Sequence, residues 1–197
     1  MDKKKILDNF QINKKIKRIS LQIIECNIEE NEIVLVGIKK NGYLLAEKIL
    51  DELKKNTDFS FKICSLKINK KQPFDNISCS LEISDYKNKS IIIIDDVLNS
   101  GSTLMYAVKY FLDTKITQLK TVVLVDRNHK KFPIKADWFL FTPNFLNFSK
   151  SCLDLVKEKV KLFKVNLIKL GNKNHFLRDF FEILPLTRNI GIFFLFI

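Results

Sequence analysis

The sequence predicts an α/β fold in which a mainly parallel, twisted sheet is flanked by helices. Residues 33–38, 91–94 and 121–126 are short aliphatic runs with no alternating polar positions. Such runs are typical of strands that are buried on both faces of a parallel sheet. The segments after the first two runs have the spacing of amphipathic helices, as the crossover connections of a parallel sheet require.

A first helix is expected to end near residue 27. Its apolar residues recur at intervals of three and four, so they lie on one face of a helix; they are Ile12, Ile16, Ile19, Ile23 and Ile24. The opposite face carries four cations: Lys14, Lys15, Lys17 and Arg18. A solvated face explains these cations more simply than contact with RNA.

The strand at residues 33–38 is followed by a polar turn and then by a helix from about residue 43 to residue 53. The turn consists of Lys39, Lys40, Asn41 and Gly42. Leu45, Ile49 and Leu53 have the spacing to face the sheet. A lysine pair in a turn is by itself a weak indication of an anion site.

Residues 59–66 are predicted to form a further strand, and residues 67–89 then form a long polar excursion. Excursions of this length inside a compact α/β domain are either disordered or functional. The sequence leaves both interpretations open.

Two adjacent acids, Asp95 and Asp96, follow the run of four isoleucines. Because a buried charge is costly, we expect the strand to stop at these acids. Both carboxylates would then lie at the carboxyl end of the strand, where open α/β sheets bind ligands. Parallel strands end on one side of the sheet, so the turn at residues 39–42 is expected to line the same crevice.

The residues after the acids predict a phosphate site. Asn99 and Ser100 lead into Gly101, which allows a tight turn. The amides of the next helical turn, with the hydroxyls of Ser102 and Thr103, can cradle a phosphate. The buried face of this helix is expected to carry Leu104, Val108, Phe111 and Leu112.

Composition limits the classes of protein and ligand that are compatible with the sequence. At 197 residues and 46% hydrophobic content, the chain can bury a core of its own. The formal net charge of +12 favours phosphorylated ligands or nucleic acid, with a solvated lysine-rich surface as the alternative. Four cysteines without a C-x-x-C pair indicate neither a zinc site nor a disulfide framework, and they favour a reduced, cytoplasmic setting.

Neither end of the chain predicts a membrane or export segment. The first five residues contain no apolar secretory signal. Residues 180–197 are rich in phenylalanine and isoleucine, but Glu182, Pro185 and Arg188 interrupt them. The remaining apolar run is too short to span a bilayer.

The run from residue 91 to residue 103 resembles the phosphoribosyl-pyrophosphate signature of type I phosphoribosyltransferases. That signature is an apolar strand, two acids, two apolar residues and a small loop of the form x-T/S-G-x-T. The chain is also similar to the pyrimidine operon attenuator/uracil phosphoribosyltransferase group, from about residue 6 to residue 138. This second similarity rests on I-L-D at 6–8, V-G-I-K at 36–39, D-D-V-L at 95–98 and D-R-x-H-x-x-x-P-I-x-A-D at 126–137.

The resemblance implies a type I phosphoribosyltransferase fold and a role for each site. The acid pair Asp95 and Asp96 would hold the ribose hydroxyls and lie beside Mg²⁺. Residues 99–103 would bind the 5′-phosphate of phosphoribosyl pyrophosphate, and residues 39–42 would receive its pyrophosphate. The implied reaction joins a nucleobase, with uracil favoured, to the ribose, and relatives of this kind are commonly homodimers.

Two residues depart from the family pattern. Asn41 stands where the family usually carries an arginine in its pyrophosphate loop. Asn99 stands where purine-salvage relatives carry an aspartate, which argues against a 6-oxopurine substrate.

Two other functions stay open beside catalysis. One is an RNA-binding regulator that senses nucleotides, with RNA contacts at Arg127, His129, Lys130 and Lys131. The other is an inactive relative.

The resemblance ends near Trp138. Residues 1–144 are therefore predicted to form the phosphoribosyltransferase-like domain, and residues 145–197 an atypical helical and apolar C-terminal extension. Within the extension a helical stripe is predicted at Leu153, Val156, Val160 and Phe163. The base pocket is expected to be incomplete or rebuilt.

Overall fold

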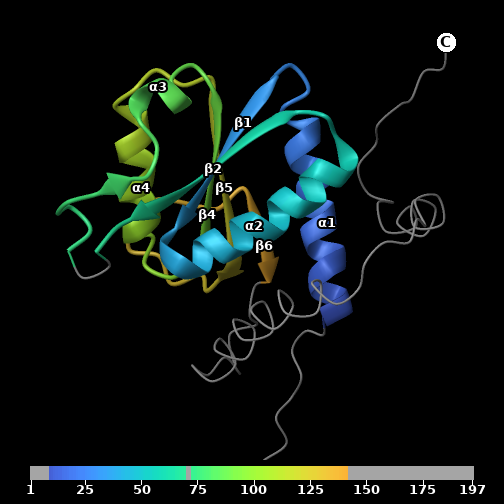
Figure 1. The fold of residues 1–197 in the computed structure, drawn as a ribbon. Helices are drawn as coiled ribbons and strands as arrows, with labels where there is room; N and C mark the ends of the chain where they lie inside the picture. Colours follow the sequence, from blue (N-terminus) through green and yellow to red (C-terminus); the bar gives the residue numbers. More distant parts are fainter. Residues whose placement is uncertain (1–8, 70–71, 142–197) are drawn as a thin grey trace, which may run out of the picture. The chain divides into compact units, whose positions relative to one another are not determined.

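A six-stranded sheet in the order β3-β2-β1-β4-β5-β6 forms the centre of the structure, a computed structural model that describes residues 9–69 and 72–141 (Figure 1). Five of its strands run parallel, and β3 alone pairs antiparallel, with β2. The parallel strands are β1 (Glu32–Ile38), β2 (Ser60–Lys67), β4 (Ser90–Leu98), β5 (Gln118–Asp126) and β6 (Trp138–Phe141), and β3 is Ser78–Cys79. The predicted α/β class and parallel sheet are confirmed.

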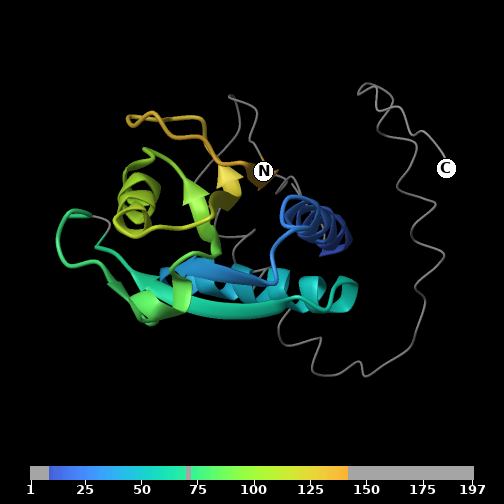
Figure 2. The ribbon, with the colours of Figure 1, turned by 90° about the horizontal axis from the view of Figure 1, so that it is seen from above.

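Helices cover both faces of the sheet. Residues of α1 (Asn9–Glu25) and α2 (Lys39–Asn56) share one buried core with one side of the central strands. The short α3 (Ile83–Tyr86) and α4 (Ser102–Leu112) contribute to a second core on the other side. In both Figure 1 and Figure 2 the strands β4 and β5 lie between α1 and α4.

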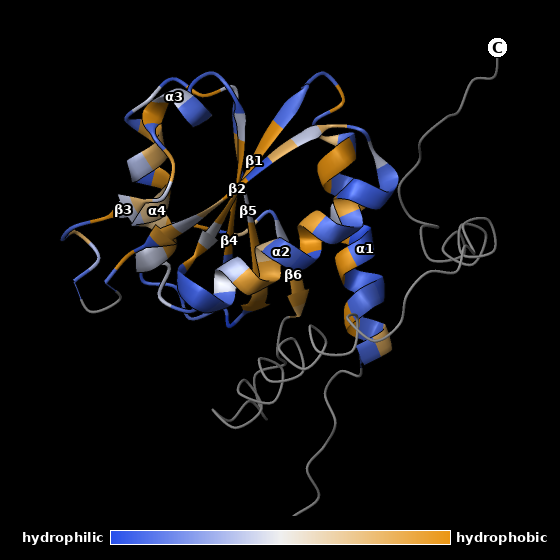
Figure 3. Ribbon diagram, in the orientation of Figure 1, coloured by the Kyte–Doolittle hydropathy of each residue, from blue (hydrophilic) through white to orange (hydrophobic). Residues whose placement is uncertain are grey.

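The four isoleucines of β4 explain why this strand is central. Ile92 and Ile94 belong to the core under α1 and α2, whereas Ile91 and Ile93 belong to the core under α4. Because successive side chains of a strand point to opposite faces, only a continuous apolar run satisfies two cores. Figure 3 shows the central strands in the hydrophobic colours.

The start of α2 differs from the prediction. The segment expected as a polar turn is the first turn of this helix, which begins at Lys39 directly after β1. Lys39 has a φ of 54°, so one residue in the left-handed region turns the chain from strand into helix.

Strand β4 also runs further than expected. It continues through both acids to Leu98 and keeps β5 as its partner, with Asp95 opposite Val123 and Val97 opposite Val125. On its other edge the pairing with β1 ends at Gly37 opposite Ile94. The acids therefore extend the strand at the point where β1 has turned into α2, and the expectation that the strand stops there is wrong.

Three smaller features refine the sequence analysis. The polar excursion at residues 67–89 contains β3 and α3 in addition to loop. In α4 the buried residues are Leu104, Ala107 and Phe111, while Leu112 is 60% exposed, contrary to expectation. Residues 138–141, at the end of the resemblance, form a regular strand of the sheet.

The predicted stripe at Leu153, Val156, Val160 and Phe163, and the whole predicted segment 145–197, lie outside the described residues. In the part of the chain that the structure describes, no helix has the length and apolar character needed to cross a membrane.

Candidate active site

The acid pair lies near the carboxyl end of β4, where Val97 and Leu98 complete the strand. Asp95 and Asp96 are only 3% and 4% exposed. The backbone amide of Asp96 donates a hydrogen bond to Oδ1 of Asp95 at 2.8 Å. Buried carboxylates need such partners, so the local backbone contributes to holding the pair in place.

The first turn of α2 lies against the acid pair. Nδ2 of Asn41 donates a hydrogen bond to Oδ2 of Asp96 at 3.0 Å. A Cβ built on Gly42 would lie 2.5 Å from the carbonyl oxygen of Ile94, so the helix approaches the strand more closely than a side chain permits. The structure thus brings together the two segments that the sequence analysis assigned to one crevice.

The predicted phosphate turn connects β4 to α4. Gly101 has a φ of 85°, a conformation that favours glycine, and the helix begins at the next residue. Oγ of Ser100 accepts a hydrogen bond from the amide of Ser102 at 3.4 Å. Asn99 is exposed, whereas the side chains of Ser102 and Thr103 are partly exposed on the first turn of the helix. Amides at this end of a helix lack intrahelical acceptors, which suits a phosphate.

Residues 127–137, which we call the basic loop, are joined to this turn by main-chain hydrogen bonds. The carbonyl oxygen of Ser100 accepts from the amides of Lys131 at 2.8 Å and Phe132 at 3.1 Å. The carbonyl oxygen of Leu98 accepts from the amide of Arg127 at 2.9 Å. The phosphate turn and the basic loop therefore form one connected piece of backbone.

The two acids of the D-R-x-H run shape the basic loop. Asp126 accepts hydrogen bonds from the amide of Asn128 at 2.9 Å and from Nζ of Lys130 at 3.1 Å. Asp137 accepts from the amide and hydroxyl of Thr121 at 2.9 and 2.8 Å. Sequence reasoning missed these structural roles, because the partners of Asp137 lie sixteen residues away along the chain.

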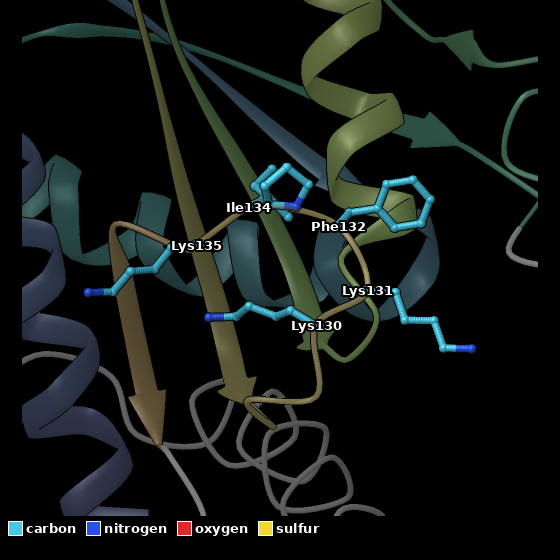
Figure 4. A pocket seen from close by; sticks show the side chains of 6 residues that line it. Lys130, Lys131, Phe132, Ile134 and Lys135 are labelled. Carbon is cyan, nitrogen blue, oxygen red and sulfur yellow. The ribbon is translucent and has the colours of Figure 1, made fainter.

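A pocket of about 500 Å³ lies along the basic loop, lined by residues 130–135 (Figure 4). Lys130 and Lys135 extend toward the same side, whereas Lys131 points away from them. His129 is exposed and Arg127 is half-buried. The four predicted RNA contacts are therefore neighbours in the loop, but Lys130 is paired with Asp126 and Lys131 points in another direction.

A second pocket, of about 530 Å³, is lined by residues that follow β1 and by residues in and after β2. It contains the predicted Lys39 and Lys40, and it adds residues that sequence reasoning did not select. The polar additions are Ser65, Lys67, Asn69 and Asn76. The register explains the place of Lys67: Ile38 pairs with Leu66, so Lys67 of β2 follows at the point where β1 gives way to α2 at Lys39.

Comparison with known proteins identifies the family to which the chain belongs. Residues 2–154 match the family model described as the phosphoribosyl transferase domain. The Bifunctional protein PyrR of Pediococcus pentosaceus is 34% identical over 145 residues, which cover 68% of this chain and 82% of that protein. Its counterpart in Clostridium perfringens is 35% identical over 144 residues, which cover 69% of this chain and 81% of that protein.

Solved structures share the fold. A hypoxanthine phosphoribosyltransferase from Staphylococcus aureus aligns with a TM-score of 0.63 at 22% identity, over 74% of this chain and 80% of that one. A hypoxanthine-guanine phosphoribosyltransferase from Bacillus anthracis aligns with a TM-score of 0.59 at 22% identity, over 71% and 81%. The chain is therefore a phosphoribosyltransferase with the type I fold, belongs to the phosphoribosyl transferase domain family and stands close to the PyrR group.

Proposed function

We propose that the chain transfers the 5-phosphoribosyl group of phosphoribosyl pyrophosphate to uracil, releasing pyrophosphate and a nucleoside monophosphate. The observation that carries this proposal is the contact between Asn41 and Asp96. It places the lysine-bearing start of α2 beside the acid pair, so a ligand can use both at once. The matches to PyrR proteins support uracil as the base.

In this reaction the bond from C1′ to the pyrophosphate oxygen breaks, and a bond from C1′ to a ring nitrogen of the base forms. The proton of that nitrogen goes to solvent. The sugar carries positive charge in the transition state, and the carboxylates of Asp95 and Asp96 orient its hydroxyls and partly offset that charge. Lys39 and Lys40 stabilise the negative charge that develops on the leaving group. Positioning supplies much of the rate, and no covalent nucleophile is invoked.

The 5′-phosphate is assigned to residues 99–103. The φ of Gly101 and the start of α4 at Ser102 support this assignment, because the first amides of a helix suit a phosphate. A phosphate there fixes one end of the sugar, and the acid pair fixes its hydroxyls.

The donor set at β4 fits Mg²⁺. Asp95 and Asp96 offer the hard oxygen ligands that this ion prefers, and Mg²⁺ at phosphate sites is commonly held by one or two carboxylates together with substrate phosphates. The described residues contain no group of three or more His, Cys, Asp or Glu side chains arranged to hold a metal. When bound, Mg²⁺ neutralises part of the charge on the pyrophosphate.

The test is the double variant Asp95→Asn with Asp96→Asn, assayed with several nucleobases, phosphoribosyl pyrophosphate and Mg²⁺. The wild-type protein should form uridine monophosphate in a single turnover, and the variant should form none while keeping its circular dichroism spectrum. Calorimetry should show weakened binding of phosphoribosyl pyrophosphate. Unchanged affinity in the variant would remove the acid pair from the site, and no product from any base with the wild-type protein would identify an inactive relative.

A second candidate function is RNA binding by a nucleotide-sensing regulator. The pocket on the basic loop favours it, because Lys130 and Lys135 extend toward the same side of this loop. Converting Lys131 and Lys135 to alanine should lower RNA affinity and flatten its dependence on salt. These two substitutions leave the ion pair between Lys130 and Asp126 unchanged. Equal, weak binding of all RNA sequences by the wild-type protein would indicate a merely basic surface.

Assembly and location complete the proposal. We infer a homodimer in the cytoplasm, supported by the family resemblance and by scattered cysteines without metal-site spacing. Analytical ultracentrifugation at several concentrations tests the dimer.

A further inference from the structure

Two cysteine side chains meet at the edge of the sheet. Cys64 lies in β2 and Cys79 in β3, and their sulfur atoms share a hydrogen bond at 3.6 Å. The two residues are 15 positions apart along the chain, so no short motif indicates the pair. Only the antiparallel return of β3 along β2 makes them neighbours.

The two thiols differ in their access to solvent. Cys64 is 1% exposed and belongs to the core under α4. Cys79 is partly exposed, and the residues on either side of it, Ser78 and Ser80, are exposed. A small oxidant in solution therefore meets Cys79 first.

Two hydrogen bonds stabilise a thiolate on Cys79. The bond shared with Cys64 lowers the pKa of Cys79 to about 7, although burial and the charge of Asp85 act in the opposite direction. The amide of Leu81 also donates to Sγ of Cys79, at 3.5 Å. Near neutral pH a large fraction of Cys79 is therefore thiolate, which is the form that reacts with oxidants.

The short strand that carries Cys79 is able to approach Cys64. In a disulfide the two sulfur atoms are about 2.0 Å apart, which is closer than in the reduced pair. Strand β3 pairs with β2 at two positions, Leu66 with Cys79 and Lys67 with Ser78, and it is the outermost strand of the described sheet. A shift of β3 toward Cys64 leaves the parallel strands in place.

We propose that Cys64 and Cys79 form a redox-active dithiol, in which Cys79 is the site of oxidation by hydrogen peroxide and Cys64 is the resolving thiol. The thiolate of Cys79 attacks one oxygen of the peroxide and the O–O bond breaks, which leaves a sulfenic acid on Cys79. The departing hydroxide takes up the proton that Cys79 had released and becomes water.

The second step closes the disulfide. The sulfur of Cys64 attacks the sulfenic sulfur, the S–S bond forms and the S–O bond breaks. The hydroxyl group leaves as water with the proton of Cys64. The two thiols lose two electrons in total, and these reduce one peroxide to two molecules of water. A thiol reductant reverses the change by thiol–disulfide exchange, which suits a reducing compartment in which lasting disulfides are rare.

The test treats the reduced, full-length protein with hydrogen peroxide and maps its disulfides by peptide mass spectrometry. We expect a bond between Cys64 and Cys79 that has lost two hydrogen atoms and that dithiothreitol removes again. The proposal is overturned if the two residues stay unlinked, or if Cys79 instead forms its bond with another cysteine of the chain.

Three variants assign the roles within the pair. Cys64→Ser keeps a hydrogen-bond donor beside Cys79 but removes the resolving sulfur, so Cys79 should accumulate as a sulfenic acid that dimedone traps. Cys79→Ser should lose the disulfide completely and leave Cys64 unlabelled. Cys26→Ser, which removes an exposed thiol outside the pair, is the matched control and should form the bond to the same extent as the wild type. Dimedone on Cys64 in the Cys79→Ser variant, or loss of the bond in the control, would contradict the proposed roles.

Discussion

The thiols of Cys64 and Cys79 differ in chemistry although their sulfur atoms lie 3.6 Å apart. The hydrogen bond that they share lowers the pKa of Cys79 to about 7, chiefly by stabilising its thiolate. The same bond and burial raise the pKa of Cys64, which therefore keeps its proton. One member of the pair is reactive near neutral pH and the other is not.

This difference predicts the order of alkylation. Iodoacetamide should modify Cys79 before Cys64, because the thiolate is the nucleophile. The rate at Cys79 should rise as the pH increases through about 7, the pKa of that thiol, and then level off. Peptide mass spectrometry over a pH series measures both sites. A Cys64→Ala variant, which removes the shared bond, should move the midpoint of the Cys79 profile upward; an unmoved midpoint would remove Cys64 as its cause.

At the scale of elements, the packing of α2 against β4 depends on Gly42. In an exposed helix, alanine in place of glycine usually stabilises by roughly 0.5–1 kcal/mol. Here the added Cβ would lie 2.5 Å from the carbonyl oxygen of Ile94, a backbone atom that cannot move alone. We therefore expect Gly42→Ala to destabilise the protein by about 1–3 kcal/mol, as overpacking does.

Urea unfolding measures this change. Lys40→Ala, on the exposed side of the same helical turn, serves as the control and should alter the free energy of unfolding by less than about 0.5 kcal/mol. Stabilisation by Gly42→Ala would mean that helix and strand are further apart than described. The variant should also weaken phosphoribosyl pyrophosphate binding, since Asn41 and Asp96 meet at this contact.

The elements show which features a sequence can predict. Buried strands and the face of α1 follow from apolar periodicity, and the structure confirms both, with Ile12, Ile16, Ile19 and Ile23 buried. Strand β4 was predicted too short because the cost of burying Asp95 and Asp96 was weighed without their partners. One of those partners, Asn41, is set by tertiary packing of α2, which no local pattern contains.

Only part of the site was predicted, because the rest depends on tertiary packing in the same way. The acid pair and the phosphate turn are continuous in sequence, so a motif identifies them. Lys67 reaches the pocket of Lys39 from β2, beside β1, and Asn76 reaches it from the loop that follows β2; both placements depend on the tertiary fold. The acids Asp126 and Asp137 belong to a recognisable run, but their partners appear only in the fold.

At the scale of the whole molecule, the extent of the sheet determines which truncated products can still fold. Leu140 in β6 is buried in the core that α1 and α2 share, so β6 belongs to the folded unit. Truncation after Phe145 keeps this strand, and we expect a folded, more soluble product with unchanged binding of phosphoribosyl pyrophosphate. Truncation after Asp137 removes the strand and should greatly destabilise the protein.

Thermal unfolding and calorimetry on the two truncated proteins measure these outcomes. Unfolding of the longer product would show that residues beyond 145 belong to the core. Equal stability of both products would show that β6 contributes little to the sheet.

The hydrogen bonds between Ser100 and the amides of Lys131 and Phe132 have a consequence for regulation. They belong to the main chain, so the connection does not depend on which side chains the loop carries. In the RNA-binding function proposed above, a nucleotide on the turn and an RNA on the loop would contact the same piece of backbone. Any effect of the nucleotide on RNA affinity would then be matched by an equal effect of the RNA on nucleotide affinity.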